Sequence, residues 1–368
     1  MSNTTRTILL AAGGTGGHLF PAFALAEELD RRGFVVDLVT DMRGDRYGSD
    51  FPARQIHRVP AATLGSDGRS IGKIMKTGTL LTKGVVSAYR LLGRIKPQAV
   101  LGFGGYPTFP PLVAARLKGI PTALHEQNAV LGRANRMLAS GVTKIATSFE
   151  QTKYLSDAWA KKAVMTGNPV RDRVIAAAKL PYDRPSPDKP FNLLVFGGSQ
   201  GARYFSDTVP AALAMLPEEQ RRRTNVVQQC REEDLDRVRT AYATSGITAQ
   251  LATFFADLPQ FIAESHLVIG RAGASSVAEL TVIGRPSILV PLPHALDNDQ
   301  LNNARQLAES GGAWCIEQKH LSAERLAEEI SGMMKVDEQL VSVAEAARLQ
   351  GRPDAVARLA DLVATMTV

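Results

Sequence analysis

Short apolar segments alternate along this chain with longer segments of helical periodicity. In the first half, β-branched and leucine-rich runs occupy Thr7–Ala11, Val35–Thr40, Ala99–Phe103, Thr122–His125 and Lys144–Thr147. The second half repeats the pattern at Asn192–Phe196, Asn225–Gln229, Ala249–Phe254, Leu267–Ile269, Ser287–Val290 and Ala313–Ile316. Helical patterns lie between or after them, as at Pro21–Arg32, Lys83–Ile95, Ala323–Met334, Glu338–Leu349 and Asp354–Thr365. This alternation predicts α/β domains with parallel sheets and crossover helices.

The length of 368 residues suits two domains. Leu180–Pro190 contains four prolines, which can continue neither a helix nor a central strand, so this segment is the best candidate for a linker. We expect a first domain at 1–168, a linker region at 169–190 and a second domain at 191–350. The last segment, 351–368, is expected to be a helix and is a candidate for packing back on the first domain.

The net charge of +7 is distributed unevenly. Residues 1–165 carry a net charge of +11 and residues 166–368 a net charge of −4. A basic first half indicates an anionic partner, such as a phosphate, an acidic membrane or a nucleic acid, without choosing among them.

Composition and segment lengths narrow the class of protein. The chain is 45% hydrophobic and has no apolar stretch long enough to span a bilayer, and its N-terminus does not resemble a signal peptide. Cys230 and Cys315 lie in apolar runs without metal-ligand spacing, so we expect both to be reduced and buried, as in a cytosolic protein.

Two glycine-rich turns each follow a predicted strand and precede a predicted helix. The first is Gly13–His18 (GGTGGH) and the second Gly197–Arg203 (GGSQGAR). Glycine lets the backbone approach a ligand closely, and a helix N-terminus favours anions. The alternative for the first is a tight strand-to-helix turn without a ligand. Neither is a GxGxxG or a GxxxxGK[ST] motif, which argues against dinucleotide-dependent oxidoreductases and Walker-type NTPases.

A third strand-to-helix junction carries more specific chemistry. Arg271 follows the strand, a turn of small residues comes next, and Glu279 lies about one turn into the helix. Arginine and free N–H groups suit a diphosphate, and a carboxylate suits paired ribose hydroxyls. Glu279 could also be an acid that complements the helix dipole. The polar cluster in Pro291–Ala304 fits hydroxyl recognition on a sugar, or a loop in which Asp297 or Asn298 caps a helix.

Six motifs in order resemble the MurG family of peptidoglycan glycosyltransferases. They are GGTGGH at 13–18, GFGGYP at 102–107, HEQN at 125–128, GNPVR at 167–171, GGSQGAR at 197–203 and RAGASSVAE at 271–279. The resemblance implies a GT-B architecture, an α/β fold of two Rossmann-like parallel-sheet domains facing a cleft. It also implies an inverting transfer of N-acetylglucosamine from UDP-N-acetylglucosamine to the C4 hydroxyl of lipid I, which forms lipid II.

The resemblance carries residue roles over by motif. In the second domain it places the diphosphate on Ser199, Arg271, Ala274, Ser275 and Ser276. The resemblance also implies that Glu279 binds the ribose, that the backbone of Phe255 binds the uracil, and that Gln300 binds the sugar hydroxyls. Thr15, Gly16, Gly17, Asn128 and Arg171 are expected around the donor and acceptor. Asp299 stands where relatives often have His or Gln, which puts its role in sugar recognition in doubt. Members generally use no metal, and we expect no cofactor.

A general base must take the proton of the acceptor hydroxyl. His18 is the first candidate, because an imidazole titrates near neutral pH and follows the glycine turn. It could instead only hydrogen-bond the ligand or backbone. Tyr106 and Glu126 are weaker alternatives.

The expected partners are UDP-N-acetylglucosamine, lipid I and the anionic inner leaflet, with no nucleic acid, because no ribonucleoprotein-type motif is present. Residues Ile71–Lys96 carry six cations among apolar residues, which predicts peripheral attachment to the cytoplasmic face of the inner membrane. A solvated helix face is the alternative. Rival functions are a UDP-N-acetylglucosamine 2-epimerase, an oxidoreductase and a non-catalytic nucleotide-sugar binding protein.

Overall fold

The computed structural model describes residues 6–13, 15–40, 51–60, 71–197 and 202–367. The chain divides into two compact units. Unit 1 comprises residues 1–171 and 353–368, and unit 2 comprises residues 172–352. The expected α/β fold with a parallel sheet in each half is confirmed. Ser199, one of the residues predicted to hold the diphosphate, lies outside the described residues.

Unit 1 is built on a seven-stranded parallel sheet in the order β3-β2-β1-β4-β5-β6-β7. The strands are β1 (Thr7–Ala11), β2 (Val35–Thr40), β3 (Gln55–Arg58), β4 (Ala99–Gly102), β5 (Thr122–Glu126), β6 (Lys144–Thr147) and β7 (Ala163–Met165). The helices are α1 (Gly16–Arg31), α2 (Ile71–Ile95), η2 (Tyr106–Thr108), α3 (Phe109–Leu117), α4 (Arg133–Ala139) and α5 (Asp157–Ala160), joined by the C-terminal α15 (Ala355–Thr365).

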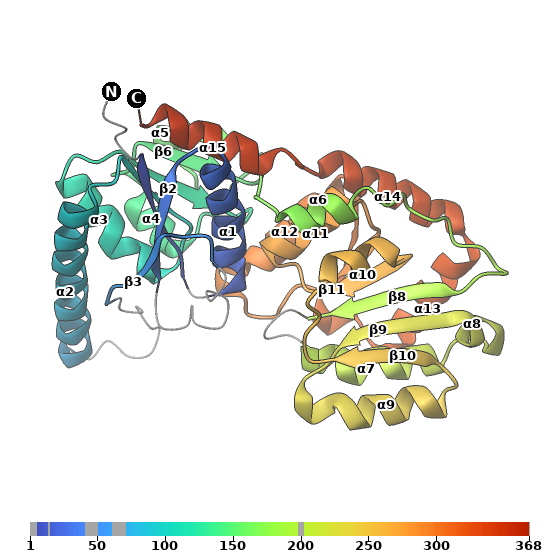
Figure 1. Cartoon of the computed structure of the whole chain (residues 1–368). Coiled ribbons are helices and arrows are strands. Elements are labelled where there is room, and N and C mark those ends of the chain that lie inside the picture. The colour runs from blue at the N-terminus through green and yellow to red at the C-terminus, as the bar shows by residue number, and fades with distance from the viewer. Residues whose placement is uncertain (1–5, 14, 41–50, 61–70, 198–201, 368) are drawn as a thin grey trace. The chain divides into compact units, whose positions relative to one another are not determined.

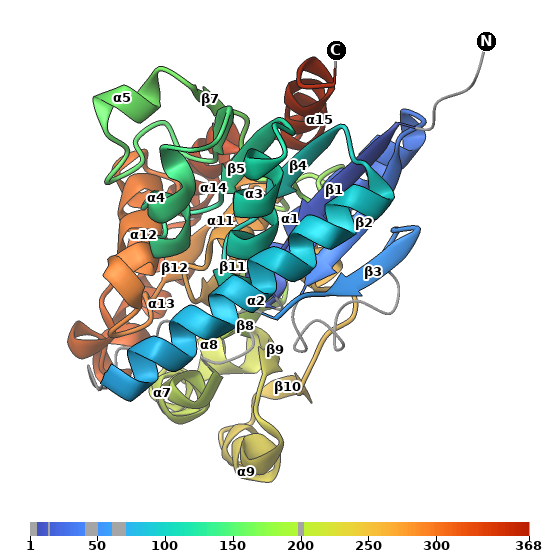
Figure 2. The same cartoon turned by 90° about the vertical axis from the view of Figure 1, so that its left-hand side faces the viewer.

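The central strand β1 explains why this sheet needs helices on both faces. Ile8 and Leu10 belong to one buried cluster and Leu9 and Ala11 to another, so successive side chains enter opposite cores. Helices α1 and α15 contribute to the first core, and α2, α3 and α4 to the second. Figure 2 shows α2 and α3 side by side over the sheet, as their contacts also indicate.

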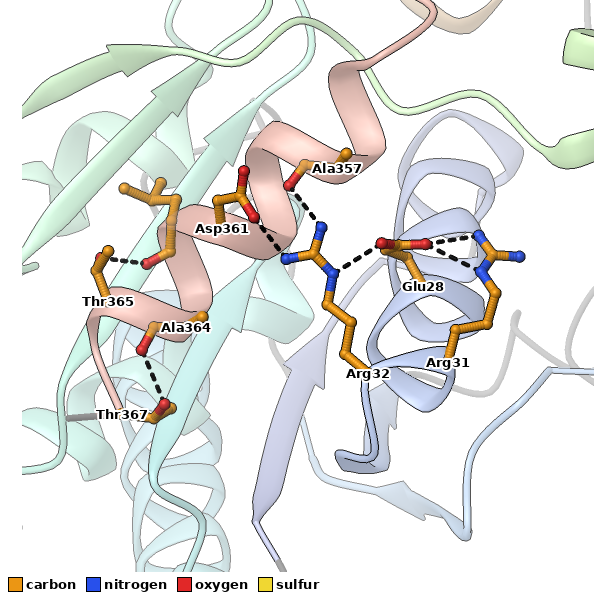
Figure 3. A network of polar contacts seen from close by, with 9 residues as sticks. Glu28, Arg31, Arg32, Ala357, Asp361, Ala364, Thr365 and Thr367 are labelled. Atoms are coloured by element: carbon orange, nitrogen blue, oxygen red, sulfur yellow. Dashed lines mark hydrogen bonds and ion pairs between the residues drawn. The ribbon is translucent and has the colours of Figure 1, made fainter.

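The C-terminal helix α15 completes the first of these cores. Leu359, Ala360, Leu362 and Val363 are buried with the residues of α1. The guanidinium of Arg32, the C-cap residue of α1, donates to the Asp361 carboxylate at 2.6 Å and to the Ala357 carbonyl at 3.3 Å (Figure 3). The last residues of the chain are therefore part of the fold of unit 1.

Unit 2 is built on a six-stranded parallel sheet in the order β10-β9-β8-β11-β12-β13. The strands are β8 (Phe191–Phe196), β9 (Thr224–Gln229), β10 (Thr248–Ala252), β11 (Leu267–Gly270), β12 (Ser287–Leu289) and β13 (Trp314–Cys315). The helices are α6 (Asp172–Ala177), α7 (Ala202–Ala214), α8 (Glu218–Arg223), η3 (Glu232–Asp234), α9 (Leu235–Thr244), α10 (Leu258–Glu264), α11 (Ala274–Ile283), η4 (Leu296–Asn298), α12 (Asp299–Glu309), η5 (Gln318–His320), α13 (Ala323–Lys335) and α14 (Asp337–Gln350).

One face of this sheet is covered by α7, α9 and α13, whose apolar residues share a core with β8 and β9. Helices α6, α10, α11 and α14 pack against one another, and Figure 1 shows them together on the other side of β8. This arrangement leaves the carboxyl ends of the parallel strands free to carry functional turns.

The proline-rich segment lies within unit 2 and does not separate the units. Arg285 is fully buried and donates to the carbonyls of Leu180 at 2.9 Å and Pro181 at 3.1 Å. The Tyr182 hydroxyl donates to the His266 carbonyl at 2.9 Å. These bonds hold the segment against unit 2, so the boundary falls between Arg171 and Asp172, before most of the expected 169–190 linker.

The cysteines are both unpaired. Cys230 is buried as expected, whereas Cys315 is only half-buried, because β13 is the edge strand of its sheet. No helix among the described residues has both the length and the apolar character needed to cross a bilayer.

Candidate active site

In unit 1 the two glycine turns after β1 and β4 meet around the ring of His18. Gly13 N–H donates to the Gly104 carbonyl at 3.2 Å. Gly104 has φ +91°, and a Cβ there would lie 3.2 Å from His18 Nε2. Glycine is therefore required at 104 both by the backbone conformation and by the closeness of the imidazole. Tyr106 follows directly, half-buried at the start of η2.

The start of α1 presents the predicted residues of the first motif together. Thr15 is the N-cap residue, Gly16 and Gly17 form the first turn, and Thr15 Oγ1 lies 3.1 Å from His18 Nδ1. The guanidinium of Arg171 lies 4.2 Å from the ring centroid of Phe20 on the same helix. Hence residues far apart in the sequence lie together in the first turns of α1, where the helix dipole favours an anion.

Glu126 organises the loop that follows β5. Its Oε1 accepts from the Asn128 N–H at 3.0 Å and from Asn128 Nδ2 at 3.3 Å. Its Oε2 accepts from the Gly132 N–H at 2.8 Å and from Asn135 Nδ2 at 2.7 Å. Burial raises the pKa of this carboxyl above its ordinary value, although the four hydrogen bonds that it accepts oppose the rise. Because both oxygens are occupied, the geometry favours a positioning role for Glu126 over that of a base.

In unit 2 Arg271, Ala274, Ser275 and Ser276, the described residues among those predicted to hold the diphosphate, lie at the junction of β11 and α11. The N-cap residue of α11 is Gly273, which offers no side-chain cap, so the first N–H groups at Ala274, Ser275 and Ser276 have no partner within the helix. Within the described part of the chain, the buried Ser275 Oγ also has no hydrogen-bond partner. Free donors at the positive end of a helix form an anion site.

Arg271 lies under this turn and is almost fully buried. Its Nη1 donates to the carbonyls of Val290 at 3.1 Å and Pro291 at 3.2 Å, and its Nη2 to Gln318 Oε1 at 2.7 Å. Burial lowers the pKa of the guanidinium from its ordinary value, and Tyr204 opposes this. The neighbouring Ala272 carbonyl accepts from Asn303 Nδ2 at 3.0 Å. The turn between β11 and α11 is thus held by the hydrogen bonds of the Arg271 side chain and by the bond from Asn303 to the Ala272 carbonyl.

The remaining predicted donor residues follow the carboxyl ends of β10, β11 and β12 in the chain. Glu279 and Phe255 are buried, and the Phe255 ring meets that of Phe261 edge-on at 5.0 Å. Gln300 Oε1 accepts from the Leu292 N–H at 3.0 Å, which leaves its Nε2 as the donor end. Asp299 Oδ1 accepts from the Gln300 N–H at 2.7 Å, and burial followed by repulsion from Asp297 raises the pKa of Asp299.

The loop before Gln300 is strained. His294, Asp297 and Asn298 have positive φ values of 58°, 55° and 54°. Left-handed backbone at residues other than glycine costs free energy and is typical of functional sites.

Comparison with known proteins identifies this arrangement. Residues 8–147 match the glycosyltransferase family 28 N-terminal domain, and residues 192–359 match its C-terminal domain. The UDP-N-acetylglucosamine--N-acetylmuramyl-(pentapeptide) pyrophosphoryl-undecaprenol N-acetylglucosamine transferase of Rhizobium etli (strain CIAT 652) is 51% identical over 97% of this chain and 94% of that protein. The protein of the same name from Sinorhizobium fredii is 53% identical over the same shares. The crystal structure of Acinetobacter baumannii MurG has a TM-score of 0.79 at 31% identity, covering 98% of this chain and 99% of that one.

The chain belongs to the MurG family, within glycosyltransferase family 28. It therefore has the GT-B architecture that its motifs predicted. The UDP-GlcNAc 2-epimerase from Neisseria meningitidis bound to UDP-GlcNAc also resembles it, with a TM-score of 0.69 over 98% of this chain and 100% of that one. At 14% identity that likeness shows the fold alone.

His125 is a buried residue of this MurG-family site to which the sequence assigned no role of its own. Its ring lies 3.0 Å from the Gly167 carbonyl through Nε2 and 3.0 Å from Gln127 Nε2 through Nδ1. Burial lowers its pKa to about 4, so it stays neutral and joins the HEQN motif to the GNPVR motif. Among the described residues no group of three His, Cys, Asp or Glu is placed to hold a metal ion.

Proposed function

We propose that this chain transfers N-acetylglucosamine from UDP-N-acetylglucosamine to the C4 hydroxyl of lipid I, with inversion, to form lipid II. The observation that carries the proposal is the junction of β11 and α11, where free N–H groups, an unpartnered Ser275 hydroxyl and the Arg271 cation lie together. The relatives from Rhizobium etli and Sinorhizobium fredii, which are 51% and 53% identical over 97% of this chain, are also named as transferases.

The donor residues would stabilise the leaving group. As the C1–O bond of the sugar breaks, negative charge builds on the diphosphate of UDP. Fixed N–H donors and a nearby cation stabilise that charge more in the transition state than in the ground state, which lowers the barrier. We assign Ala274, Ser275, Ser276 and Arg271 to this task. Glu279 would bind the ribose, Phe255 the uracil, and Gln300 the sugar hydroxyls through Nε2.

The acceptor side would lie at the start of α1 in unit 1. Thr15, Gly16 and Gly17 offer an anion site at the helix N-terminus, and Arg171 adds a cation. His18 is proposed as the base that takes the acceptor proton, with Thr15 Oγ1 orienting its Nδ1. Asn128, held by Glu126, would bind a polar group of a substrate.

A membrane surface is proposed as a further partner. On α2, the exposed cations Lys83, Arg90 and Arg94 lie on one face at helical spacing, together with the exposed side chain of Val86. Cations beside apolar groups suit an anionic lipid surface. We therefore propose peripheral attachment at the cytoplasmic face of the inner membrane.

The proposed reaction is tested by incubating the protein with UDP-N-acetylglucosamine, with and without a lipid I analogue. Release of UDP and formation of the disaccharide lipid only when the analogue is present are expected. Conversion of the donor into its 2-epimer without acceptor would support the epimerase instead, and neither product would indicate a non-catalytic binding protein.

A further inference from the structure

Arg271 is a buried cation whose described contacts are neutral. Three of its N–H bonds go to the carbonyls of Val290 and Pro291 and to the Gln318 side chain, at 2.7 to 3.2 Å. Its guanidinium also lies 4.9 Å from the ring centroid of Phe205 and 5.4 Å from that of Tyr204. Among the residues that the structure describes, no carboxylate lies within ion-pair distance of it. A buried charge without a counter-ion is costly unless a ligand supplies one.

The short helix η5 and the residue after it hold Arg271 in place. Gln318, the first residue of η5, accepts from Nη2, and the Leu321 carbonyl accepts from the hydroxyl of Tyr204, whose ring flanks the guanidinium. Glu317, next to Gln318, is engaged elsewhere, 3.6 Å from Arg305 and 3.5 Å from Lys319. The only side-chain acceptor found on Arg271 in the described part of the chain is thus an amide.

We propose that Gln318 is a positioning residue of the donor site that holds Arg271 without neutralising it. This inference rests on the proposed function, because the counter-charge that completes the site is the diphosphate of a nucleoside diphosphate. A carboxylate at 318 could make the same hydrogen bond, but it would supply the negative charge that the ligand must otherwise bring. The neutrality of Gln318 is therefore what keeps the site selective for a dianionic ligand.

The decisive test compares Gln318→Glu with Gln318→Ala. Calorimetry would measure the affinities of both variants and the unmodified protein for UDP and for uridine, which lacks the diphosphate. We expect Gln318→Glu to weaken UDP binding about 10- to 100-fold and to leave uridine binding unchanged. Gln318→Ala keeps the charge of Arg271 but removes the acceptor that holds its guanidinium. This variant should weaken UDP binding by a smaller factor. Gln339→Glu makes the same charge change at an exposed position of α14 and should change neither affinity.

The outcomes separate this inference from the proposed function. If Gln318→Glu binds UDP as tightly as the unmodified protein, or loses UDP and uridine affinity equally, Gln318 is only a structural hydrogen-bond partner and the inference is wrong. If the unmodified protein itself binds neither UDP nor UDP-N-acetylglucosamine, the proposed function fails first. Thermal unfolding of each variant verifies that the fold of unit 2 is kept.

Discussion

At the scale of single residues, His18 and Glu126 illustrate how packing separates a reactive group from a positioning one. The His18 imidazole lies among glycines that leave room around it, and Thr15 Oγ1 approaches its Nδ1. The Glu126 carboxylate is buried and accepts four hydrogen bonds from its own loop. The sequence placed both residues in motifs that resemble one family but could not show this difference, because the partners of Glu126 lie two to nine residues further on.

The His18 assignment makes a kinetic prediction. His18→Ala should lower turnover by about 10²–10⁴-fold, since the acceptor hydroxyl loses its base. The affinity for UDP should stay nearly unchanged, because the proposed donor residues are in unit 2. Steady-state rates with a lipid I analogue, together with UDP titration, measure both quantities. Full activity in this variant would remove His18 from the mechanism.

Buried His125 predicts a pH dependence of stability. Its folded-state pKa of about 4 lies below the ordinary value of 6.5, so the unfolded chain binds the proton more readily. Stability from this group is present above about pH 6.5 and is lost as the pH falls towards 4, a loss of about 3 kcal/mol in the free energy of unfolding. Urea unfolding of the protein and of His125→Gln at pH 7, 5.5 and 4.5 tests this. Equal losses in both proteins over that range would contradict the assignment.

At the scale of elements, the sequence predicted the buried strands of unit 1 well but missed its two edge strands. β1, β2 and β6 have the expected bounds, and their residues are almost all buried. β3 (Gln55–Arg58) and β7 (Ala163–Met165) were missed, since each lies at an edge of the sheet and is mostly exposed or half-buried. Helix α1 begins at Gly16, five residues before the expected Pro21, because the helix includes the last glycines of the turn.

Helix α2 carries the membrane prediction. Replacing Lys83, Arg90 and Arg94 by alanine should weaken binding to phosphatidylglycerol vesicles about 100-fold, at about 1 kcal/mol per cation. Binding to zwitterionic phosphatidylcholine vesicles should be weak for the unmodified protein and for the triple variant alike. Arg231, Arg239 and Lys335 are exposed cations of unit 2, and their triple alanine variant is the matched control. Equal co-sedimentation of the two triple variants would exclude α2 as the contact surface.

At the scale of the whole molecule, the proline-rich segment was the least predictable part. Four prolines suggested a linker at Leu180–Pro190, but a single buried arginine, Arg285, binds this segment to unit 2 from about a hundred residues away. The contact between Arg271 and Gln318 likewise joins residues 47 positions apart. Local patterns cannot reveal such pairs, because only the topology of the sheet brings them together.

The C-terminal helix α15 predicts a stability effect in unit 1. Leu359→Ala should lower the free energy of unfolding by about 2–5 kcal/mol, since it leaves a cavity in the core shared with α1. Arg358→Ala, at the preceding and exposed position, should cost about 0.5 kcal/mol or less, the contribution of its ion pair with Asp354. Chemical unfolding followed by a probe in unit 1 compares them. Similar effects of the two changes would show that α15 does not belong to this core.

The central claim of this account is that the diphosphate of the donor binds at the N-terminus of α11, beside Arg271. A crystal structure of the protein with UDP-N-acetylglucosamine tests it most directly. The account predicts phosphate oxygens within hydrogen-bond distance of the N–H groups of Ala274, Ser275 and Ser276. A nucleotide bound with its phosphates away from this helix end would contradict the account.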